Sequence, residues 1–377
     1  MKKILSLCIV LYGIAIFPAI AMETAAKQAF MMDADTGTVL LNKSGDEQMH
    51  PSSMSKLMTT YIAFKRLKEG RMKLTDTLTV SEKAWKMQGS KTFVHVGDSV
   101  PVEELLYGII IQSGNDACIV IAEGISGSEE AFAAEMNKVA KEIGMNNSNF
   151  VNATGWPDDG HLMTARDLAI LAKHLINDFP EYYHYFAVPE HTYNKIRQYN
   201  RNLLLGGDLG VDGLKTGHTE VAGYGITLSA KKDGRRLILV VNGLESEKQR
   251  KEEGDRLLRY GFREFTNKKL VSKGQNVADA TVWFGERERV GLIADADIVA
   301  TVPHAKMPDM KFTLKYNSPV PAPIAKGTHI ADLVITQQGG AEQTVPLLAA
   351  EDVEKLSGFG RIKAFFKHSL MGGTPES

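Results

Sequence analysis

The sequence predicts an α+β fold, in which an antiparallel sheet packs between helices, followed by a small all-β sandwich domain and a C-terminal amphipathic helix. Three observations in the 377-residue chain support this prediction. Strand patterns flank a helix-rich stretch in the first part of the chain. From about residue 268 to 350, short apolar runs are broken by Gly, Pro and Asp. The C-terminal residues again space apolar side chains at the helical period.

The first part begins and ends with predicted strands. Four runs carry strand signals, at 29–33, 38–42, 223–231 and 235–242. Asp35-Thr36-Gly37 predicts a hairpin turn between the first two runs, and Asp233-Gly234 joins the last two. A helix-rich middle extends to about residue 177, and a closing helix is predicted over 247–265. This order favours a central antiparallel sheet with helices on its faces.

The second part has the pattern of a β-sandwich. Four short runs read as strands, at 290–293, 298–302, 312–316 and 329–335. No catalytic constellation occurs among them, so this part is interpreted as a spacer or as a partner-binding platform. The sequence thus predicts an export signal at 1–21, a catalytic domain at 22–266, a β-sandwich domain at 267–350, and a helix with its tail at 351–377.

The first 21 residues have the pattern of a secretory signal. Two lysines precede an apolar run over 4–20, and Ala19-Ile20-Ala21 supplies a small-residue cleavage site. An uncleaved membrane anchor is the alternative, although the run is short for a span and is interrupted by Gly and Pro. Both interpretations predict an exported protein. Cleavage leaves Cys118 as the single cysteine, so no intramolecular disulfide can form.

Composition is that of an ordinary folded protein. Lysine and arginine total 44 and aspartate and glutamate total 45, for a net charge of −1. This balance gives no sign of the excess basic charge that is typical of a nucleic-acid-binding protein. The hydrophobic content of 44% is ample for a folded core.

Three short motifs, far apart in the sequence, carry the chemistry. They are Ser53-Met54-Ser55-Lys56, Ser113-Gly114-Asn115 and Lys215-Thr216-Gly217. In this order they match the constellation of serine acyl-transferases that open an amide without a catalytic histidine. Each is weak alone, because a lone Ser53 is more often a helix cap and residues 113–115 form an ordinary turn. Their joint occurrence predicts an enzyme.

The first motif makes chemical sense on a helix. Apolar side chains run at mainly helical spacing from Met54 to Lys68, so Ser53 falls in the first turn. Backbone N–H groups and the positive end of the helix dipole favour developing negative charge there. Lys56 lies three residues further on the same face, where its amine can approach the Ser53 hydroxyl. A lysine can act as a base when burial and neighbouring positive charge lower its pKa, and Lys215 is the candidate for that charge.

The third motif lies in a predicted edge strand. Residues 211–219 read as a turn leading into a strand, with which an extended peptide can pair. We expect the backbone N–H groups of Ser53 and His218 to form an oxyanion hole. The middle motif falls in a loop between two helical stretches, where Ser113 can relay a proton to the leaving amine and Asn115 can bind the substrate amide. Those two predicted helices lie at 102–111 and 116–123.

Additional stretches accompany the motifs, namely Val151-Asn152-Ala153-Thr154-Gly155, Asp158-Asp159-Gly160-His161, Met163-Thr164-Ala165-Arg166-Asp167 and Asp212-Gly213-Leu214. With them the chain resembles the penicillin-binding D-alanyl-D-alanine carboxypeptidases, serine enzymes of bacterial cell-wall metabolism, over nearly the whole mature chain. The resemblance implies a β-lactamase/transpeptidase-like catalytic domain in which Ser53 is acylated and Lys56 is the base. It also implies that Ser113 lines the cleft and that substrate is bound by Asn115, Lys215, Thr216, Gly217, His218, Arg201 and Arg250.

Chemistry independently favours a cation near that strand. A carboxypeptidase must distinguish a free C-terminal carboxylate from an internal peptide, and arginine can bind a carboxylate with two parallel hydrogen bonds. The resemblance assigns this role to Arg201 and Arg250. The alternative for Arg250 is a solvent-facing position at the start of a helix.

These observations predict an exported serine D,D-carboxypeptidase that removes the terminal D-Ala from peptidoglycan stem pentapeptides and is blocked by β-lactams. We expect no metal and no cofactor. One alternative is a class A-like β-lactamase, which needs a deacylating glutamate, and the nearest candidate is Glu190 with Asn194. The other is a non-catalytic cell-wall-binding protein.

The C-terminal residues predict a membrane-surface helix over 352–371. One broad helical arc carries Leu356, Phe359, Ile362, Phe366 and Leu370. Arg361, Lys363 and Lys367 make this segment locally basic, which is typical of a helix lying in a membrane interface. A helix packed against the enzyme's own body is the alternative. We therefore expect a periplasmic protein attached peripherally to the outer face of the cytoplasmic membrane.

Overall fold

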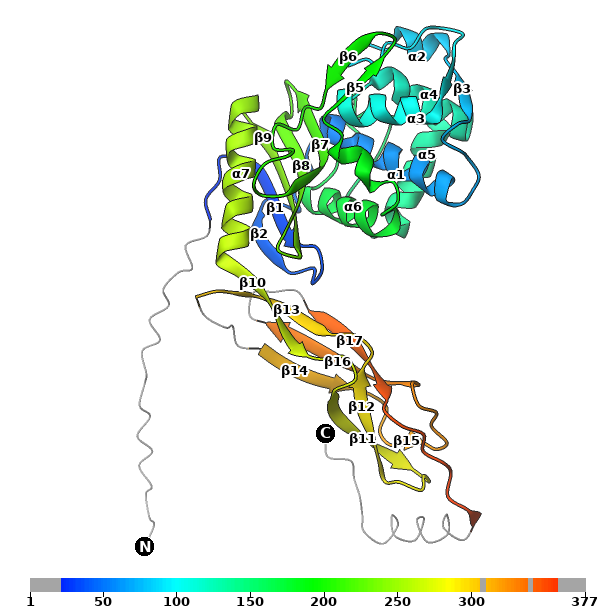
Figure 1. The fold of residues 1–377 in the computed structure, drawn as a ribbon, viewed down its shortest axis with the longest axis vertical. Helices are drawn as coiled ribbons and strands as arrows, with labels where there is room; N and C mark the ends of the chain where they lie inside the picture. Colours follow the sequence, from blue (N-terminus) through cyan, green and yellow to red (C-terminus); the bar gives the residue numbers. More distant parts are fainter. Residues whose placement is uncertain (1–21, 306–309, 338–341, 359–377) are drawn as a thin grey trace, which may run out of the picture.

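The computed structural model describes residues 22–305, 310–337 and 342–358. The predicted export signal, and the predicted C-terminal helix beyond residue 358, lie outside the described residues. Figure 1 shows an elongated molecule, with a sheet and its helices at one end and a second, all-β part at the other.

A five-stranded sheet forms the centre of the first part. Its order is β2-β1-β9-β8-β7, and every neighbouring pair is antiparallel. The strands are β1 (Gln28–Asp33), β2 (Val39–Lys43), β7 (Val211–Thr219), β8 (Gly223–Lys232) and β9 (Arg235–Leu244). The predicted antiparallel sheet is confirmed, and β7 forms one of its edges.

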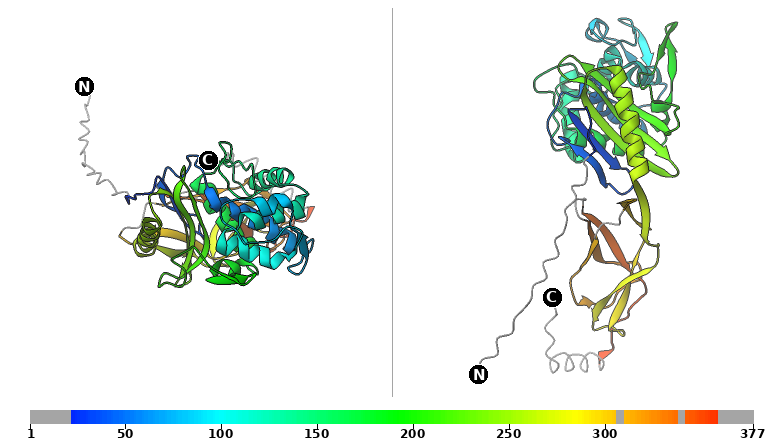
Figure 2. Two further views of the ribbon diagram at one scale, coloured as in Figure 1. Left: turned by 90° about the horizontal axis from the view of Figure 1, so that it is seen from above. Right: turned by 90° about the vertical axis from the view of Figure 1, so that its left-hand side faces the viewer.

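The sheet is buried on both faces. On β9, Leu239 and Val241 pack in one apolar cluster with the residues of α7 (Glu247–Glu264), whereas Ile238 and Val240 pack in another with α1 (Lys56–Lys68) and α6 (Ala165–Asp178). Alternate residues therefore point to opposite faces, and both faces are covered, so the strand is apolar throughout. Figure 2 shows α7 on one side of the sheet and the helical body on the other.

The helical body carries the middle motif. Its remaining elements are η1 (Ser52–Ser55), α2 (Glu82–Lys86), α3 (Val102–Tyr107), η2 (Gly108–Gln112), α4 (Asn115–Ser126), α5 (Glu129–Glu142) and η3 (Tyr183–Ala187). The predicted helix over 102–111 is an α-helix that continues as a π-helical turn. Two short hairpins complete this part, β3 (Thr77–Thr79) with β4 (Ser99–Pro101), and β5 (Glu190–Tyr193) with β6 (Ile196–Tyr199).

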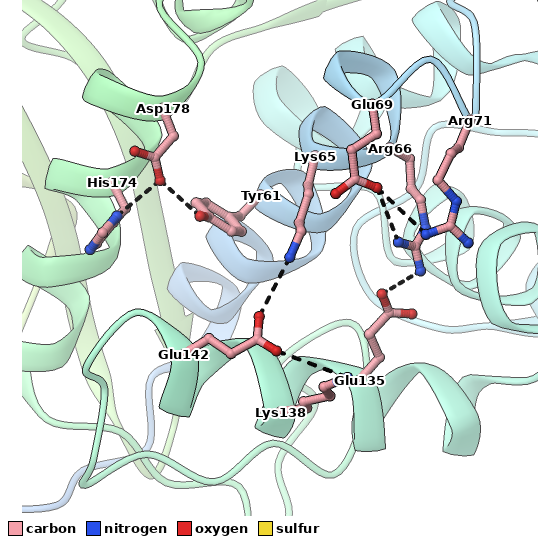
Figure 3. A network of polar contacts seen from close by, with 10 residues as sticks. All are labelled: Tyr61, Lys65, Arg66, Glu69, Arg71, Glu135, Lys138, Glu142, His174 and Asp178. Atoms are coloured by element: carbon pink, nitrogen blue, oxygen red, sulfur yellow. Dashed lines mark hydrogen bonds and ion pairs between the residues drawn. The ribbon is translucent and has the colours of Figure 1, made fainter.

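Polar contacts fix α1 against α5 and α6 (Figure 3). The Tyr61 hydroxyl donates to Asp178 Oδ2 at 2.8 Å. Lys65 and Glu142 form an ion pair at 3.4 Å, and Arg66 pairs with Glu135. The helix that follows the serine motif is thereby tied to two neighbours as well as packed in the core.

The second part is all-β, as predicted. Its strands are β10 (Phe265–Val271), β11 (Asn276–Trp283), β12 (Arg289–Ala294), β13 (Ile298–Pro303), β14 (Met310–Lys315), β15 (Val320–Pro321), β16 (His329–Gln337) and β17 (Gln343–Ala349). One sheet has the order β14-β16-β17-β12-β11-β15, and β10 pairs with β13 in a second sheet. The first strand therefore starts two residues before the predicted segment 267–350.

The predicted start of the C-terminal helix at Asp352 is wrong. Val353 forms a β-bridge with Ile324 and is 2% exposed in the core of the all-β part. Lys355 forms another bridge with Gly285. The Leu356 N–H, from the first residue of the predicted arc, donates to the Phe284 carbonyl oxygen at 2.9 Å, so this residue pairs with the β-domain. Within the described residues, no helix combines the length and apolar character needed to cross a membrane.

A buried ion pair joins the sheet to the connection between the two parts. Arg235 Nε donates to Asp33 Oδ2 at 2.8 Å, and Asp33 is fully buried. Arg235 Nη1 also donates to the carbonyl oxygens of Gly261 and Phe265, at the end of α7 and the start of β10. One side chain thus links β1, β9 and the α7–β10 connection.

Asp33→Ala should destabilise the protein strongly, because it leaves the Arg235 guanidinium buried without a counter-charge. We expect a loss of about 3–5 kcal/mol of unfolding free energy, measured by urea denaturation. The exposed neighbour Asp35 provides the control, and Asp35→Ala should change stability by no more than about 0.5 kcal/mol. Equal effects of the two substitutions would contradict the role assigned to the buried pair.

Candidate active site

The serine motif occupies a turn that other backbone segments approach very closely. Ser53 lies in η1, directly before α1, and its neighbour Ser52 has a φ of 50°. A Cβ on Gly155 would lie 1.9 Å from the Ser52 carbonyl oxygen, and one on Gly217 would lie 2.8 Å from the Pro51 carbonyl oxygen. Gly155 also has a φ of 74°. Only glycine fits these two positions, which bring the 150s loop and β7 to the nucleophile.

Lys56 is buried beside Ser53. Its Nζ lies 2.9 Å from Ser53 Oγ, 2.7 Å from Asn115 Oδ1 and 2.5 Å from the Thr154 carbonyl oxygen. Two of these partners, Asn115 Oδ1 and Thr154 O, can only accept hydrogen bonds. A neutral amine can donate to both and accept from the Ser53 hydroxyl. The surroundings therefore suit a lysine that acts as a base.

Two buried lysine amines share this region. Desolvation, with a smaller contribution from the charge of Arg201, lowers the pKa of Lys56 to about 8. Desolvation also lowers the pKa of Lys215 well below its usual value, with repulsion from Lys56 as the next cause. Burial raises the pKa of Cys118 to about 12, so the thiol is neutral and offers no compensating charge. The charge of Lys56 thus favours the neutral form of Lys215.

The middle motif contributes Ser113, which has a strained backbone, and the side-chain amide of Asn115, which contacts Lys56. Ser113 has φ 68° and ψ 32°, its side chain is buried, and its Oγ has no hydrogen-bond partner among the described residues. Asn115 Nδ2 donates to the Gln88 carbonyl oxygen at 2.7 Å, which orients Oδ1 toward Lys56. A buried hydroxyl without a partner is costly, and such groups cluster at functional sites.

Asp116 holds the loop that contains Ser90 and Thr92. Its buried carboxylate accepts the backbone N–H groups of Thr92, Phe93 and Val94, at 2.8 to 3.4 Å. The same loop places the Ser90 carbonyl oxygen 2.8 Å from the Asn115 N–H. It also presents Ser90 Oγ to Arg201. An anion in a nest of N–H groups therefore orders the loop on which Asn115 and Arg201 depend.

Asp116→Asn should lower kcat/KM for a peptide substrate by roughly tenfold to a hundredfold, because the amide NH₂ would face backbone donors and displace the loop. Steady-state kinetics on the folded variant would measure this loss. Asp98→Asn is the matched control, since Asp98 is an exposed carboxylate of the same loop region. If both variants retained full activity, the loop would not depend on the Asp116 carboxylate.

Two arginines lie near Lys215. Arg201 Nη1 donates to Ser90 Oγ at 2.9 Å, and Arg250 Nη2 donates to Glu247 at 2.7 Å. Burial lowers the pKa of both guanidinium groups, and both contribute to lowering the pKa of Lys215. Arg250 is 5% exposed, so the alternative of a solvent-facing helix start is wrong. This end of the site is strongly cationic.

Tyr224 connects Arg250 to the edge strand. Its ring stacks on His218 with centroids 3.9 Å apart, and the Arg250 guanidinium lies 5.7 Å from its centroid. His218 on β7 and Tyr224 on β8 are cross-strand partners. The hairpin register could have predicted this pair, because residues opposite each other in an antiparallel ladder share a face.

A cavity of about 610 Å³ lies beside Ser53, and its lining among the described residues does not include Lys56, Ser113, Lys215, Arg201 or Arg250. Its lining includes the predicted residues Ser53, Asn115 and His218 and the neighbours Ser90, Thr154 and Thr219. The structure places Thr216 and Gly217 in β7 beside the serine turn, with Ser52 Oγ 3.1 Å from Thr219 Oγ1. Within the described residues, no cluster of three or more His, Cys, Asp or Glu side chains could hold a metal ion.

Sequence reasoning missed several contributors. Thr154 acts through its carbonyl oxygen, which no residue type signals. Asp116 reads as an ordinary acidic residue at a helix N-terminus. His161 Nε2 lies 2.7 Å from Ser55 Oγ, and burial lowers the His161 pKa to about 4, so this ring is a neutral link between the 150s loop and the serine turn.

The geometry defines a class of protein, the serine acyl-transferases that use a buried lysine. A family model described as D-alanyl-D-alanine carboxypeptidase matches residues 16–246, and one described as penicillin-binding protein 5, C-terminal domain, matches residues 265–355. The chain belongs to the D-alanyl-D-alanine carboxypeptidase family, and the resemblance drawn from its motifs is confirmed.

Known relatives resemble the chain over most of its length. It is 38% identical to the D-alanyl-D-alanine carboxypeptidase DacC of Escherichia coli (strain K12) over 353 residues, which cover 92% of this chain and 88% of that protein. Penicillin binding protein 5 from Haemophilus influenzae superposes with a TM-score of 0.80 at 35% identity, covering 89% of this chain and 99% of the other. Penicillin-Binding Protein D2 from Listeria monocytogenes, solved in an ampicillin-bound form, superposes with a TM-score of 0.59 at 28% identity, covering 64% of this chain and 98% of the other.

Proposed function

We propose that the protein is a serine D-alanyl-D-alanine carboxypeptidase that removes the terminal D-Ala from peptidoglycan stem pentapeptides. The observation that carries this proposal is the buried Lys56 amine, 2.9 Å from Ser53 Oγ and held by two further acceptors. Membership of the carboxypeptidase family and the names of its relatives support the substrate class.

Acylation begins with proton transfer from Ser53 to the neutral amine of Lys56. The Ser53 oxygen attacks the carbonyl carbon of the penultimate D-Ala, and the N–H groups of Ser53 and His218 stabilise the oxyanion. Ser113, whose hydroxyl has no partner among the described residues, relays the proton held by Lys56 to the departing amine of the terminal D-Ala, so that the Ser113 hydroxyl and the Lys56 amine both return to their starting states and the transfer balances. Water then cleaves the Ser53 ester and releases the shortened peptide.

Recognition of a free C-terminus falls to the cationic end of the site. Lys215, Arg201 and Arg250 attract the terminal carboxylate, while Asn115, Thr216 and Gly217 contact the peptide along β7. Because β7 is an edge strand of its sheet within the described residues, an extended peptide can pair with it. A β-lactam presents a similar carboxylate and amide, so it would acylate Ser53 and block the enzyme.

The glutamate nominated for the class A-like β-lactamase alternative, Glu190, lies outside the catalytic cavity. Glu190 lies on β5, pairs with Arg197 of β6 and does not line the cavity around Ser53. Its companion Asn194 donates to the Phe93 carbonyl oxygen. The non-catalytic alternative conflicts with a base in hydrogen-bond contact with its nucleophile.

Ser53→Ala should abolish both D-Ala release from a D-Ala-D-Ala pentapeptide and stable labelling by penicillin, because no other group can form the ester. Released D-Ala and labelled protein on a gel measure the two steps. Ser272→Ala, in an exposed loop of the all-β part, should retain both. Rapid penicillin hydrolysis by the unmodified protein would favour the β-lactamase, and neither activity would favour the binding protein.

The second-order rate of acylation should rise with pH and level off above about 8, the value to which desolvation lowers the pKa of Lys56. Only the neutral amine can accept the proton, so the rate gains roughly tenfold per pH unit below that value. Arg201→Ala should move the midpoint to higher pH, since Arg201 lowers the pKa of Lys56. Arg197→Ala, at an exposed and paired arginine, should not move it.

We propose in addition that the protein is exported to the periplasm, where its peptidoglycan substrate lies. The signal-like pattern of residues 1–21 supports export. The basic, apolar pattern within 359–371 supports attachment to the outer face of the cytoplasmic membrane.

A further inference from the structure

The catalytic cavity contains a second group of residues that the reaction does not use. Trp156, Pro157, Glu220 and Val221 line it together with the serine turn. Trp156 and Val221 are 43% and 67% exposed, respectively, which is high for large apolar side chains. Among the described residues, no side chain pairs with the exposed Glu220 carboxylate.

Charge sets the direction in which a peptide lies along β7. Arg201 and Arg250 act electrostatically on Lys215, in the middle of the strand, whereas Glu220 directly follows its last residue. A terminal carboxylate at the cationic end requires a peptide antiparallel to β7. Its preceding residues then extend past His218 and Thr219 toward Glu220. With the carbonyl of the penultimate D-Ala in the proposed oxyanion hole at His218, the residue before it lies about 3.3 Å further along the strand, beside Thr219, and its side chain extends toward Glu220.

The Trp156 residue, which lines the same cavity as Glu220, is held in place. Its backbone N–H donates to Asn152 Oδ1 at 3.2 Å, and its backbone carbonyl oxygen accepts from Asn152 Nδ2 at 3.0 Å. A Cβ on Gly89 would lie 3.0 Å from Trp156 Cζ3 and 2.8 Å from Asn115 Nδ2. The ring therefore packs on Gly89, next to the middle motif, and forms a fixed wall of the cavity.

We propose that Glu220 and Trp156 form a subsite for the side-chain ammonium of the third residue of the stem peptide, its diamino acid. This inference rests on the proposed carboxypeptidase function. The Glu220 carboxylate pairs with the ammonium, while the Trp156 ring packs against the methylene groups and attracts the cation through its π face. The charge of the Glu220 carboxylate thereby selects the third residue of the peptide.

Two pentapeptides test the subsite, L-Ala-γ-D-Glu-L-Lys-D-Ala-D-Ala and the same peptide acetylated on the lysine side chain. Acetylation removes the charge and leaves the scissile bond unchanged. For the unmodified enzyme, acetylation should lower kcat/KM for D-Ala release roughly three- to fivefold, as expected of a partly exposed ion pair. Glu220→Gln should remove this preference, and raising the salt concentration should reduce it in the unmodified enzyme.

Asp159→Asn is the matched control, because Asp159 is an exposed carboxylate of the Trp156 loop that does not line the cavity. It should keep the full preference for the free ammonium. Trp156→Ala should raise KM for both peptides, since both have the methylene groups. Circular dichroism would show that each variant is folded.

The possible results distinguish a failure of the proposed subsite from a failure of the proposed carboxypeptidase function. Equal kcat/KM for the two peptides in the unmodified enzyme, or an unchanged preference in Glu220→Gln, would overturn the subsite and leave the carboxypeptidase function standing. No D-Ala release from either peptide would overturn the proposed function and the subsite with it.

Discussion

The burial of two amines in one pocket is the constraint on which the rest of the structure depends. Lys56 and Lys215 are 0% and 3% exposed, and an ammonium removed from water is stable only with compensating groups. The nearby carboxylate of Asp116 is occupied by backbone N–H groups, and the Cys118 thiol is neutral. The pair therefore lowers its free energy by losing a proton, which leaves an amine free to act as a base.

The scaffold sustains this arrangement through close backbone contacts and rigid support. Gly155 and Gly217 let two segments touch the serine turn, and Ser52 and Ser113 adopt left-handed backbone conformations. Such strain persists only where the surrounding packing determines the structure. Here the support comes from α1, which lies in the core and is tied to α5 and α6 (Figure 3).

Residue types could predict the convergence of Ser53, Lys56 and Lys215, because each motif carries a side chain with an evident chemical role. They could not predict contacts made by the main chain, such as the Thr154 carbonyl oxygen on Lys56. Periodicity predicted the central sheet, since both its faces are buried and its strands are strongly apolar. It failed over 352–356, because the sequence does not distinguish an extended segment that pairs with the β-domain from the first turn of a helix.

In the proposed reaction, the cations that recognise the substrate also control the base. Arg201 lowers the pKa of Lys56 and, together with Arg250, that of Lys215. A bound terminal carboxylate offsets this repulsion and stabilises the lysinium that forms as Ser53 attacks. A peptide without a free C-terminus leaves the repulsion in place, so its transition state is disfavoured even when it binds. Specificity for a free C-terminus therefore arises in the chemical step as well as in binding.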